Sequence, residues 1–255
     1  MFLAVDAGNT KITFGFFDDN NVLKEIRNIS SNKNAQYSDL KQTIKNVCNG
    51  YSISRCMIAS VVDELTENIQ KSITEIFNIN PQTVSSTNCG INIKTPQPEK
   101  CGADRIANVY AAIKLYDKRP VIIVDSGSAT TFDIIDKNND FIGGLIMPGM
   151  ELQLKALGEK TSKLPALDIH NIQDNVSVIS NTTEESIYAG VVIAHAQAIQ
   201  GLINLCEQKL NEKAYLVGTG GNINLVSKYM DKINLDVVNQ KLTLEGIKLI
   251  YDLNN

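Results

Sequence analysis

Apolar residues along the first half of the chain form short runs typical of strands and spaced patterns typical of helices. Three consecutive runs rich in β-branched and aromatic residues predict strands over 2–6, 12–17 and 22–29. Apolar residues at helical spacing predict helices over 38–50 and 64–77, with a buried strand over 55–62 between them and a short strand at 84–86 after them. Strand, strand, strand, helix, strand, helix is the order of a ribonuclease-H-like unit.

The second half of the chain repeats the three-strand start of the first. After a helix predicted over 103–115, the chain predicts further strands at 120–125, 130–135, 141–147, 214–217 and 235–238. Helices are predicted over 151–157, 183–208, 223–230 and 244–253, and a polar connection over 161–180. The sequence therefore predicts an α/β fold of two ribonuclease-H-like (actin-like ATPase) domains with mixed sheets flanked by helices. The predicted domains are residues 1–116 and 117–255.

One short motif occurs once in each half, directly after an apolar strand. Val5-Asp6-Ala7-Gly8-Asn9 corresponds to Val124-Asp125-Ser126-Gly127-Ser128, and a β-prone run follows each copy. A glycine permits a sharp turn, whose backbone N–H groups can bind phosphate oxygens, and a carboxylate can hold a hydrated magnesium ion. The pair indicates two hairpins that face a shared cleft, the layout of sugar kinases and actin. The alternative is two ordinary hairpin turns.

A second candidate site is Gly102-Ala103-Asp104-Arg105, at the start of a predicted helix. The positive end of the helix and Arg105 both favour anions, so a substrate carboxylate or phosphate could bind here. The same charges would keep Asp104 ionised, ready to accept a proton from an attacking hydroxyl group. The alternative is an N-capping aspartate with a surface salt bridge.

Two further glycine-rich stretches follow strands. Gly218-Thr219-Gly220-Gly221-Asn222 precedes a helix and would allow an adenosine or phosphate group to approach the backbone closely. Its spacing fits neither a Walker A loop nor a dinucleotide fingerprint, and a tight turn is the alternative. The stretch from Gly143 to Gly149 would let either a substrate or a neighbouring helix approach closely.

Composition and charge narrow the function classes. The formal net charge of −4 and the lack of any Lys/Arg-rich run argue against nucleic-acid binding as the main task. No apolar run reaches the ~18–20 residues of a membrane span, and the start of the chain does not resemble a signal peptide. Five cysteines without metal-like spacing indicate reduced thiols in a cytoplasmic protein. With only two histidines, a histidine zinc site or a Ser-His-Asp triad has little support, and His195 is interpreted as a partly buried helix residue.

With these motifs in this order, the chain resembles the type III pantothenate kinases of bacteria, in the acetate and sugar kinase/Hsp70/actin superfamily. The resemblance covers nearly the whole chain. The residues that carry it are Asp6-x-Gly8-Asn9-Thr10, Ala59-Ser60-Val61-Val62, Gly102-Ala103-Asp104-Arg105, Asp125-x-Gly127-x-Ala129-x-Thr131, Gly143-Gly144-x-Ile146-x-Pro148-Gly149, Thr183 to Gly190, Gly220-Gly221 and Leu242-x-Leu244-Glu245-Gly246.

The resemblance implies transfer of the ATP γ-phosphate to the primary hydroxyl of pantothenate, the first step towards coenzyme A. It places ATP near three parts of the chain: the first hairpin with Asp6, Gly8, Asn9, Thr10, Lys11 and Thr13, then Ser128, and then the Gly220-Gly221 pair. Asp6 would act on Mg²⁺ through the phosphates. Asp125 would bind a monovalent cation, K⁺ or NH₄⁺.

Pantothenate would bind at Gly102, Ala103, Asp104 and Arg105, with Arg105 near its carboxylate and Asp104 as the base, and at Thr183. The resemblance also implies a homodimer with pantothenate at the interface and helices 103–115 and 183–208 as candidates for the contact. Two positions depart from the family pattern. Ser128 replaces a threonine and keeps the hydroxyl, and Thr182 replaces an asparagine, which leaves Thr182 and Thr183 both open as the substrate contact.

Two other functions stay open at this point. A regulatory or accessory protein could share the fold without catalysis, although Asp6, Asp104, Arg105 and Asp125 are all in place. A kinase of another small hydroxy acid would need the same residues. An actin-like filament is disfavoured because 255 residues leave no room for the extra subdomains.

Overall fold

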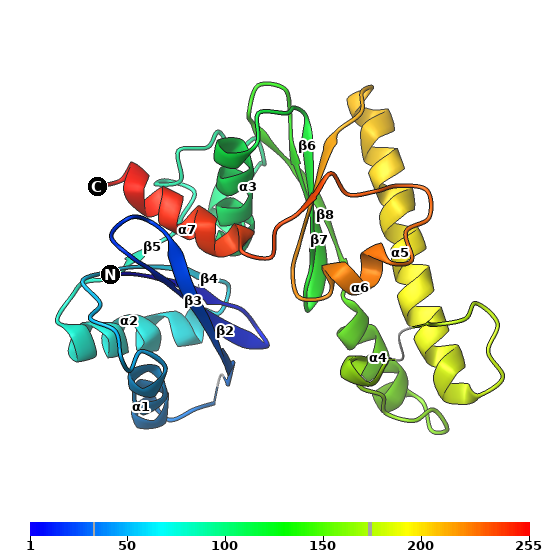
Figure 1. Ribbon diagram of the computed structural model, residues 1–255, viewed down its shortest axis with the longest axis horizontal. Helices are drawn as coiled ribbons and strands as arrows, with labels where there is room; N and C mark the ends of the chain where they lie inside the picture. The colour runs from blue at the N-terminus through cyan, green and yellow to red at the C-terminus, as the bar shows by residue number, and fades with distance from the viewer. Residues whose placement is uncertain (33, 173–174) are drawn as a thin grey trace. The chain divides into compact units, whose positions relative to one another are not determined.

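The structure, a computed structural model, describes residues 1–32, 34–172 and 175–255. It divides into two compact units, residues 1–117 with 241–255, and residues 118–240 (Figure 1). Each unit contains one five-stranded mixed sheet with helices packed against it. The predicted α/β class is therefore confirmed.

The sheet of the first unit has the strand order β3-β2-β1-β4-β5. The first three strands are antiparallel, and β4 and β5 run parallel to β1. The strands are β1 (Phe2–Ala7), β2 (Lys11–Phe17), β3 (Leu23–Ser30), β4 (Arg55–Ser60) and β5 (Gln82–Thr83). The helices are α1 (Tyr37–Val47), α2 (Asp63–Phe77), the 3₁₀ turn η1 (Pro98–Lys100), α3 (Ala103–Leu115) and α7 (Leu242–Leu253).

Both faces of strand β1 are buried. Successive side chains of a strand point to opposite sides, so alternate residues of β1 join two different clusters. Leu3 and Val5 belong to the cluster that also holds Ile44 of α1 and Ile69 of α2. Phe2 and Ala4 belong to a second cluster with buried residues of α3 and α7. Packing on both faces fixes the end of β1, where Asp6 lies.

Helix α7 corrects the predicted domain boundary, which assigned all of 117–255 to the second domain. Residues 241–255 belong to the first unit, where Leu244, Ile247 and Ile250 join the cluster with Phe2. A Cβ on Gly246 would lie 2.0 Å from the carbonyl oxygen of Ala107, so only glycine allows this close approach of α7 to α3. A contact between residues so distant along the chain leaves no local pattern, and the sequence order alone suggested the wrong unit.

The second unit repeats the architecture of the first. Its sheet has the order β10-β9-β6-β7-β8, with β6, β7 and β8 antiparallel and β9 and β10 parallel to β6. The strands are β6 (Val121–Ser126), β7 (Ala129–Ile135), β8 (Phe141–Pro148), β9 (Tyr215–Thr219) and β10 (Val237–Val238). The helices are α4 (Met150–Lys160), η2 (Ile169–Asn171), α5 (Thr183–Leu210) and α6 (Ile223–Ser227). The repeat read from the two Asp-x-Gly motifs is therefore a repeat of whole sheets.

Some predicted ends differ from the observed ones. The short strand expected at 84–86 lies at Gln82–Thr83, and the backbone N–H of Val84 adds one more bond, to the carbonyl of Ile58. The helix expected over 223–230 ends at Ser227, and the last strand covers only Val237–Val238 of the predicted 235–238. These elements are too short for periodicity to define their ends.

Helix α5 is long and apolar enough to cross a membrane by length and composition. Half of its most apolar window is nevertheless buried within the protein. Its residues Val192, Ile199 and Ile203 pack in the same cluster as Ile122 and Val124 of β6. This pattern is typical of a core helix and gives no support to a membrane span.

Candidate functional site

The first hairpin presents a cluster of polar groups at the end of β1. Asp6 is half-buried and lies opposite Thr13 in the β1–β2 ladder. The backbone N–H of Gly8 donates to the carbonyl of Lys11 at 3.0 Å and closes the turn. Asn9, Thr10 and Lys11 are exposed at its tip. The turn can thus offer backbone N–H groups, hydroxyl and ammonium groups to an anion.

The loop after β4 connects this hairpin to the start of α3. The backbone N–H of Val61 donates to the carbonyl of Ala7 at 3.2 Å. Val61 Cγ1 would lie 3.4 Å from a Cβ placed on Gly102. The structure therefore brings two predicted parts of the site, residues 6–11 and 102–105, close together within one unit. Sequence reasoning assigned no role to the side chain of Val61, because an apolar residue after a strand gives no chemical signal.

Asp104 lies in the first turn of α3 rather than at its N-cap, which is Gly102. Its Oδ1 accepts a hydrogen bond from the backbone N–H of Arg105 at 2.7 Å. A Cβ on Gly102 would lie only 2.5 Å from that oxygen, so the glycine leaves the space that the carboxylate fills. The alternative of an N-capping aspartate does not match this arrangement.

Burial raises the pKa of Asp104, although the Arg105 backbone hydrogen bond and the Arg105 charge both lower it. The neighbouring charges do favour the ionised carboxylate, as expected, but burial has the larger effect on the pKa. The sequence argument weighed only the neighbouring charges, and it could not include the loss of water around the side chain. A raised pKa brings a carboxylate closer to the working pH of a general base.

The second hairpin packs tightly against the turn between β8 and α4. Its own turn is closed by the N–H of Gly127, which donates to the carbonyl of Ala129 at 3.1 Å. The N–H of Gly149 donates to the carbonyl of Ser128 at 3.1 Å, and a Cβ on Gly149 would lie 2.3 Å from the carbonyl oxygen of Gly127. The sequence left open whether the stretch from Gly143 to Gly149 admits a substrate or another part of the protein. Gly149 admits another part of the protein, the backbone of the second hairpin.

The glycine loop after β9 lies against Asp125. Gly220 has a φ of +90°, and a Cβ there would lie 2.4 Å from Asp125 Oδ1 and 2.6 Å from the carbonyl oxygen of Ser126. The N–H of Asn222 donates to that same carbonyl at 2.9 Å, and Asn222 Nδ2 donates to Glu151 Oε1 at 3.4 Å. Asp125, Gly220 and Asn222 thus lie together, and Asn222 links them to Glu151, which sequence reasoning missed. These contacts do not include Ser128, which bonds to Gly149 instead.

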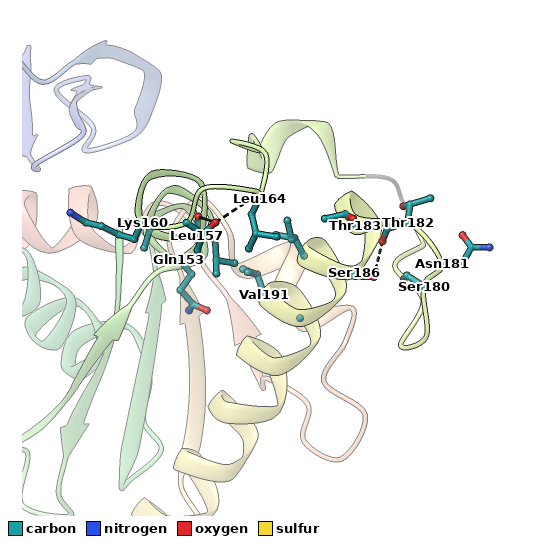
Figure 2. Close-up of a pocket in the computed structure, with 14 residues that line it drawn as sticks. Gln153, Leu157, Lys160, Leu164, Ser180, Asn181, Thr182, Thr183, Ser186 and Val191 are labelled. Atoms are coloured by element: carbon teal, nitrogen blue, oxygen red, sulfur yellow. Dashed lines mark hydrogen bonds between the residues drawn. The ribbon is translucent and has the colours of Figure 1, made fainter.

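A cavity of about 940 Å³ lies beside the start of α5, between this helix, α4 and the residues Thr161, Leu164 and Ser180. Figure 2 shows Gln153, Leu157 and Lys160 of α4 on one side and the hydroxyl groups of Thr182 and Thr183 on another. Thr182 is the N-cap of α5, and its Oγ1 accepts from the N–H of Glu185 at 3.2 Å. The Thr183 side chain has no such role, so its hydroxyl is available to a ligand in the cavity.

The described residues contain no group of three or more His, Cys, Asp or Glu side chains that could hold a metal by themselves. Proteins bind Mg²⁺ at nucleotides through one or two carboxylates and the phosphates. Asp6 and Asp125 are each the second-last residue of the first strand of their unit, so each could supply one carboxylate.

The sequence profile of the type III pantothenate kinase family matches residues 2–205 of the chain. A type III pantothenate kinase from Agathobacter rectalis is 35% identical over 261 residues, which cover all of this chain and 98% of that protein.

Solved structures with similar folds cover nearly the whole chain. A Baf family protein from Campylobacter jejuni, described as a transcriptional activator, has a TM-score of 0.62 at 20% identity over 99% of this chain and 98% of that one. A ROK family glucokinase from Streptomyces griseus, in complex with glucose and AMPPNP, has a TM-score of 0.58 at 13% identity over 98% and 99%. At these identities the likeness concerns the fold alone.

Proposed function

Because the chain belongs to the type III pantothenate kinase family, it is an ATP-dependent pantothenate kinase of coenzyme A biosynthesis, and we propose that Asp104 is its catalytic base. The observation that carries this assignment is the place of the Asp104 carboxylate. It lies at the start of α3, in the same unit as the 6–11 hairpin. The Val61 N–H bonds to the Ala7 carbonyl, and the Val61 side chain lies near Gly102. The family match argues against the regulatory alternative.

Phosphoryl transfer makes modest demands on the protein. The pantothenate hydroxyl oxygen bonds to the γ-phosphorus, the bond to the bridging oxygen of ADP breaks, and the hydroxyl proton passes to Asp104. Positioning and charge neutralisation dominate such a reaction. In this proposal Arg105 binds the pantothenate carboxylate, and Gly102 and Ala103 supply backbone at the helix start.

In the first unit, Gly8, Asn9, Thr10, Lys11 and Thr13 are proposed to bind ATP phosphates, and Asp6 would act on Mg²⁺ through the phosphates. The second unit has its own proposed nucleotide contacts, Ser128, Gly220 and Gly221. Mg²⁺, when bound, neutralises phosphate charge, and the oxygen donors present suit such a hard cation.

Turnover itself tests the assignment as a pantothenate kinase. A coupled ADP-release assay with ATP, Mg²⁺, K⁺ and pantothenate should show turnover that depends on pantothenate. A panel of other small hydroxy acids serves as the control for acceptor choice. No ADP release with folded protein, or a strong preference for another hydroxy acid, contradicts the proposal.

Asp125 is proposed to bind a monovalent cation. Its carboxylate lies against Gly220 and beside the carbonyl oxygen of Ser126, a set of hard oxygen atoms. Replacing K⁺ or NH₄⁺ by Na⁺ is expected to lower kcat at least about tenfold, because a site sized for K⁺ would hold the smaller, more strongly hydrated Na⁺ poorly and its charge near the phosphates would be lost. Asp125→Asn should remove this dependence, measured as kcat against cation at constant ionic strength. Equal rates in K⁺ and Na⁺ contradict the role.

Thr183, rather than Thr182, is proposed as the substrate contact. Thr183→Val keeps the shape and removes the hydroxyl, so the KM for pantothenate should rise about 3–10-fold, the size of one hydrogen bond of ~0.5–1.5 kcal/mol. Thr182→Val is the matched control. It removes the N-cap and should lower the free energy of unfolding by about 1 kcal/mol without a specific rise in KM. The reverse result assigns the contact to Thr182.

We also infer that the protein is a cytoplasmic homodimer with contacts from α3 and α5. All five cysteines are free, which fits a reducing compartment. The outer face of α5 carries small or apolar exposed residues such as Gly190, Ala194 and Leu205. A monomeric mass by light scattering at assay concentration contradicts the dimer.

A further inference from the structure

The turn that follows β4 is held by a small network of hydroxyl groups. Thr66 Oγ1 of α2 donates to Ser60 Oγ at 2.7 Å and lies 2.9 Å from the carbonyl oxygen of Val62. Ser60 Oγ in turn accepts from the backbone N–H of Val62 at 3.2 Å. The side chain of Val62 is 1% exposed and belongs to the core cluster that also holds Ile58. The turn is therefore anchored on both sides of Val61.

Val61, between these anchors, stays at the surface of the first unit. It is 37% exposed, and its backbone N–H donates to the carbonyl of Ala7 at 3.2 Å. One point in space, the position of a Cβ on Gly102, lies 3.4 Å from Val61 Cγ1 and 2.5 Å from Asp104 Oδ1. The valine methyl group and the carboxylate are therefore neighbours across a residue without a side chain. All of these contacts lie within the first unit.

An exposed valine has no special meaning at most surface positions. Beside a catalytic carboxylate it has a consequence, because an acceptor whose hydroxyl reaches Asp104 brings its neighbouring carbon atoms against Val61. Apolar substituents on those carbons displace water from the valine methyl groups, which stabilises the complex. A polar substituent at the same place loses its water and gains no hydrogen bond from the valine side chain.

We propose that Val61 is a specificity-determining residue that contacts an apolar branch beside the reacting CH₂OH group of the acceptor, and that Thr66 is the positioning residue that fixes the Val61 turn. The proposal rests on the proposed role of Asp104 as the base. Pantothenate meets this requirement, because its reacting CH₂OH group is attached to a carbon that carries two methyl groups. Small hydroxy acids without such a branch lack this contact.

A substrate analogue isolates the contact. In this analogue hydrogen replaces both methyl groups of pantothenate, and the hydroxyl, amide and carboxylate groups are kept. The wild type should use it with a kcat/KM about 4–15-fold lower than that for pantothenate, the value of one to two buried methyl groups. Val61→Ala should lose a similar factor on pantothenate. It should show little further loss on the analogue, because both changes remove the same contact.

Val22→Ala is the matched control. Val22 is 49% exposed and follows β2, at the opposite end of this strand from the 6–11 hairpin. This variant should keep the wild-type kcat/KM on both substrates. If Val61→Ala discriminates between pantothenate and the analogue as strongly as the wild type does, the role of Val61 is overturned.

Asp104→Asn separates that failure from a failure of the proposed function. If Asp104→Asn loses turnover while Val61→Ala discriminates normally, only the assignment of Val61 is wrong. If Asp104→Asn turns over at the wild-type rate, the acceptor hydroxyl does not bind at Asp104, and both proposals are wrong.

Thr66 has its own readout, the ratio of kcat/KM for pantothenate to that for the analogue. Thr66→Val keeps the shape of the side chain and removes the hydroxyl that bonds to Ser60. The ratio should fall towards that of Val61→Ala, and Thr66→Ser, which keeps the hydroxyl, should restore it. A loss of stability alone lowers the amount of folded enzyme and leaves this ratio unchanged. An unchanged ratio in Thr66→Val therefore overturns the positioning role.

Discussion

Asp104→Asn is expected to lower kcat about 10²–10⁴-fold, the usual contribution of a positioned general base. The amide has nearly the shape of the carboxylate but cannot accept the proton of the pantothenate hydroxyl. Its oxygen can still accept from the backbone N–H of Arg105, so the start of α3 should keep its structure. The measurement is the steady-state rate together with the Kd for an ATP analogue, which should not change.

Asp39→Asn is the matched control for this variant. Asp39 is an exposed aspartate in the first turn of α1, so its replacement also removes a negative charge at a helix start. It should leave kcat within a factor of about two, as most surface substitutions do. Turnover of Asp104→Asn at the wild-type rate would falsify the role of Asp104 as base.

The raised pKa of Asp104 also gives a direction for the pH profile. The base works only when ionised, so kcat should fall as the pH falls through its pKa. Because burial raises the pKa of Asp104, the acid limb should lie at higher pH than for an ordinary aspartate. The pH profile of the residual activity of Asp104→Asn should lack this acid limb.

The comparison of sequence and structure separates local signals from contacts between distant residues. Continuous apolar runs defined β1 and β6, and the glycines placed the turns, because both depend on neighbours along the chain. The family resemblance is confirmed by the family match, and several of the motifs that carried it lie in these locally determined turns. The matching strand orders of the two sheets follow from the same repeat.

What the sequence could not provide depends on packing. The place of α7 in the first unit follows from its contact with Ala107, far away in the chain. The net effect on Asp104 depends on how much water burial removes, which no motif encodes. His195 was interpreted as a partly buried helix residue, yet it is almost fully buried and bonded at both nitrogens.

Gly220→Ala is expected to lower both activity and stability. The residue has a φ of +90°, where an L side chain is strained, and its Cβ would collide with Asp125 Oδ1 and the backbone of Ser126. The backbone strain alone should lower the free energy of unfolding by about 1–3 kcal/mol. The collision must also displace the Asp125 carboxylate, so the KM for ATP and the concentration of K⁺ for half-maximal rate should each rise at least about tenfold.

Gly50→Ala separates backbone strain from the collision with Asp125. Gly50 has nearly the same φ, +92°, but no atom lies within 4 Å of its Cβ position. This control should lose a similar amount of stability in denaturant unfolding and keep the wild-type KM for ATP and K⁺ dependence. If Gly220→Ala behaves like Gly50→Ala in the kinetic assays, then the contact between Gly220 and Asp125 has no part in nucleotide or cation binding. If the KM for ATP and the K⁺ dependence change in Gly220→Ala and not in Gly50→Ala, Asp125 and the glycine loop form a common site. The added methyl group meets the carboxylate only in Gly220→Ala.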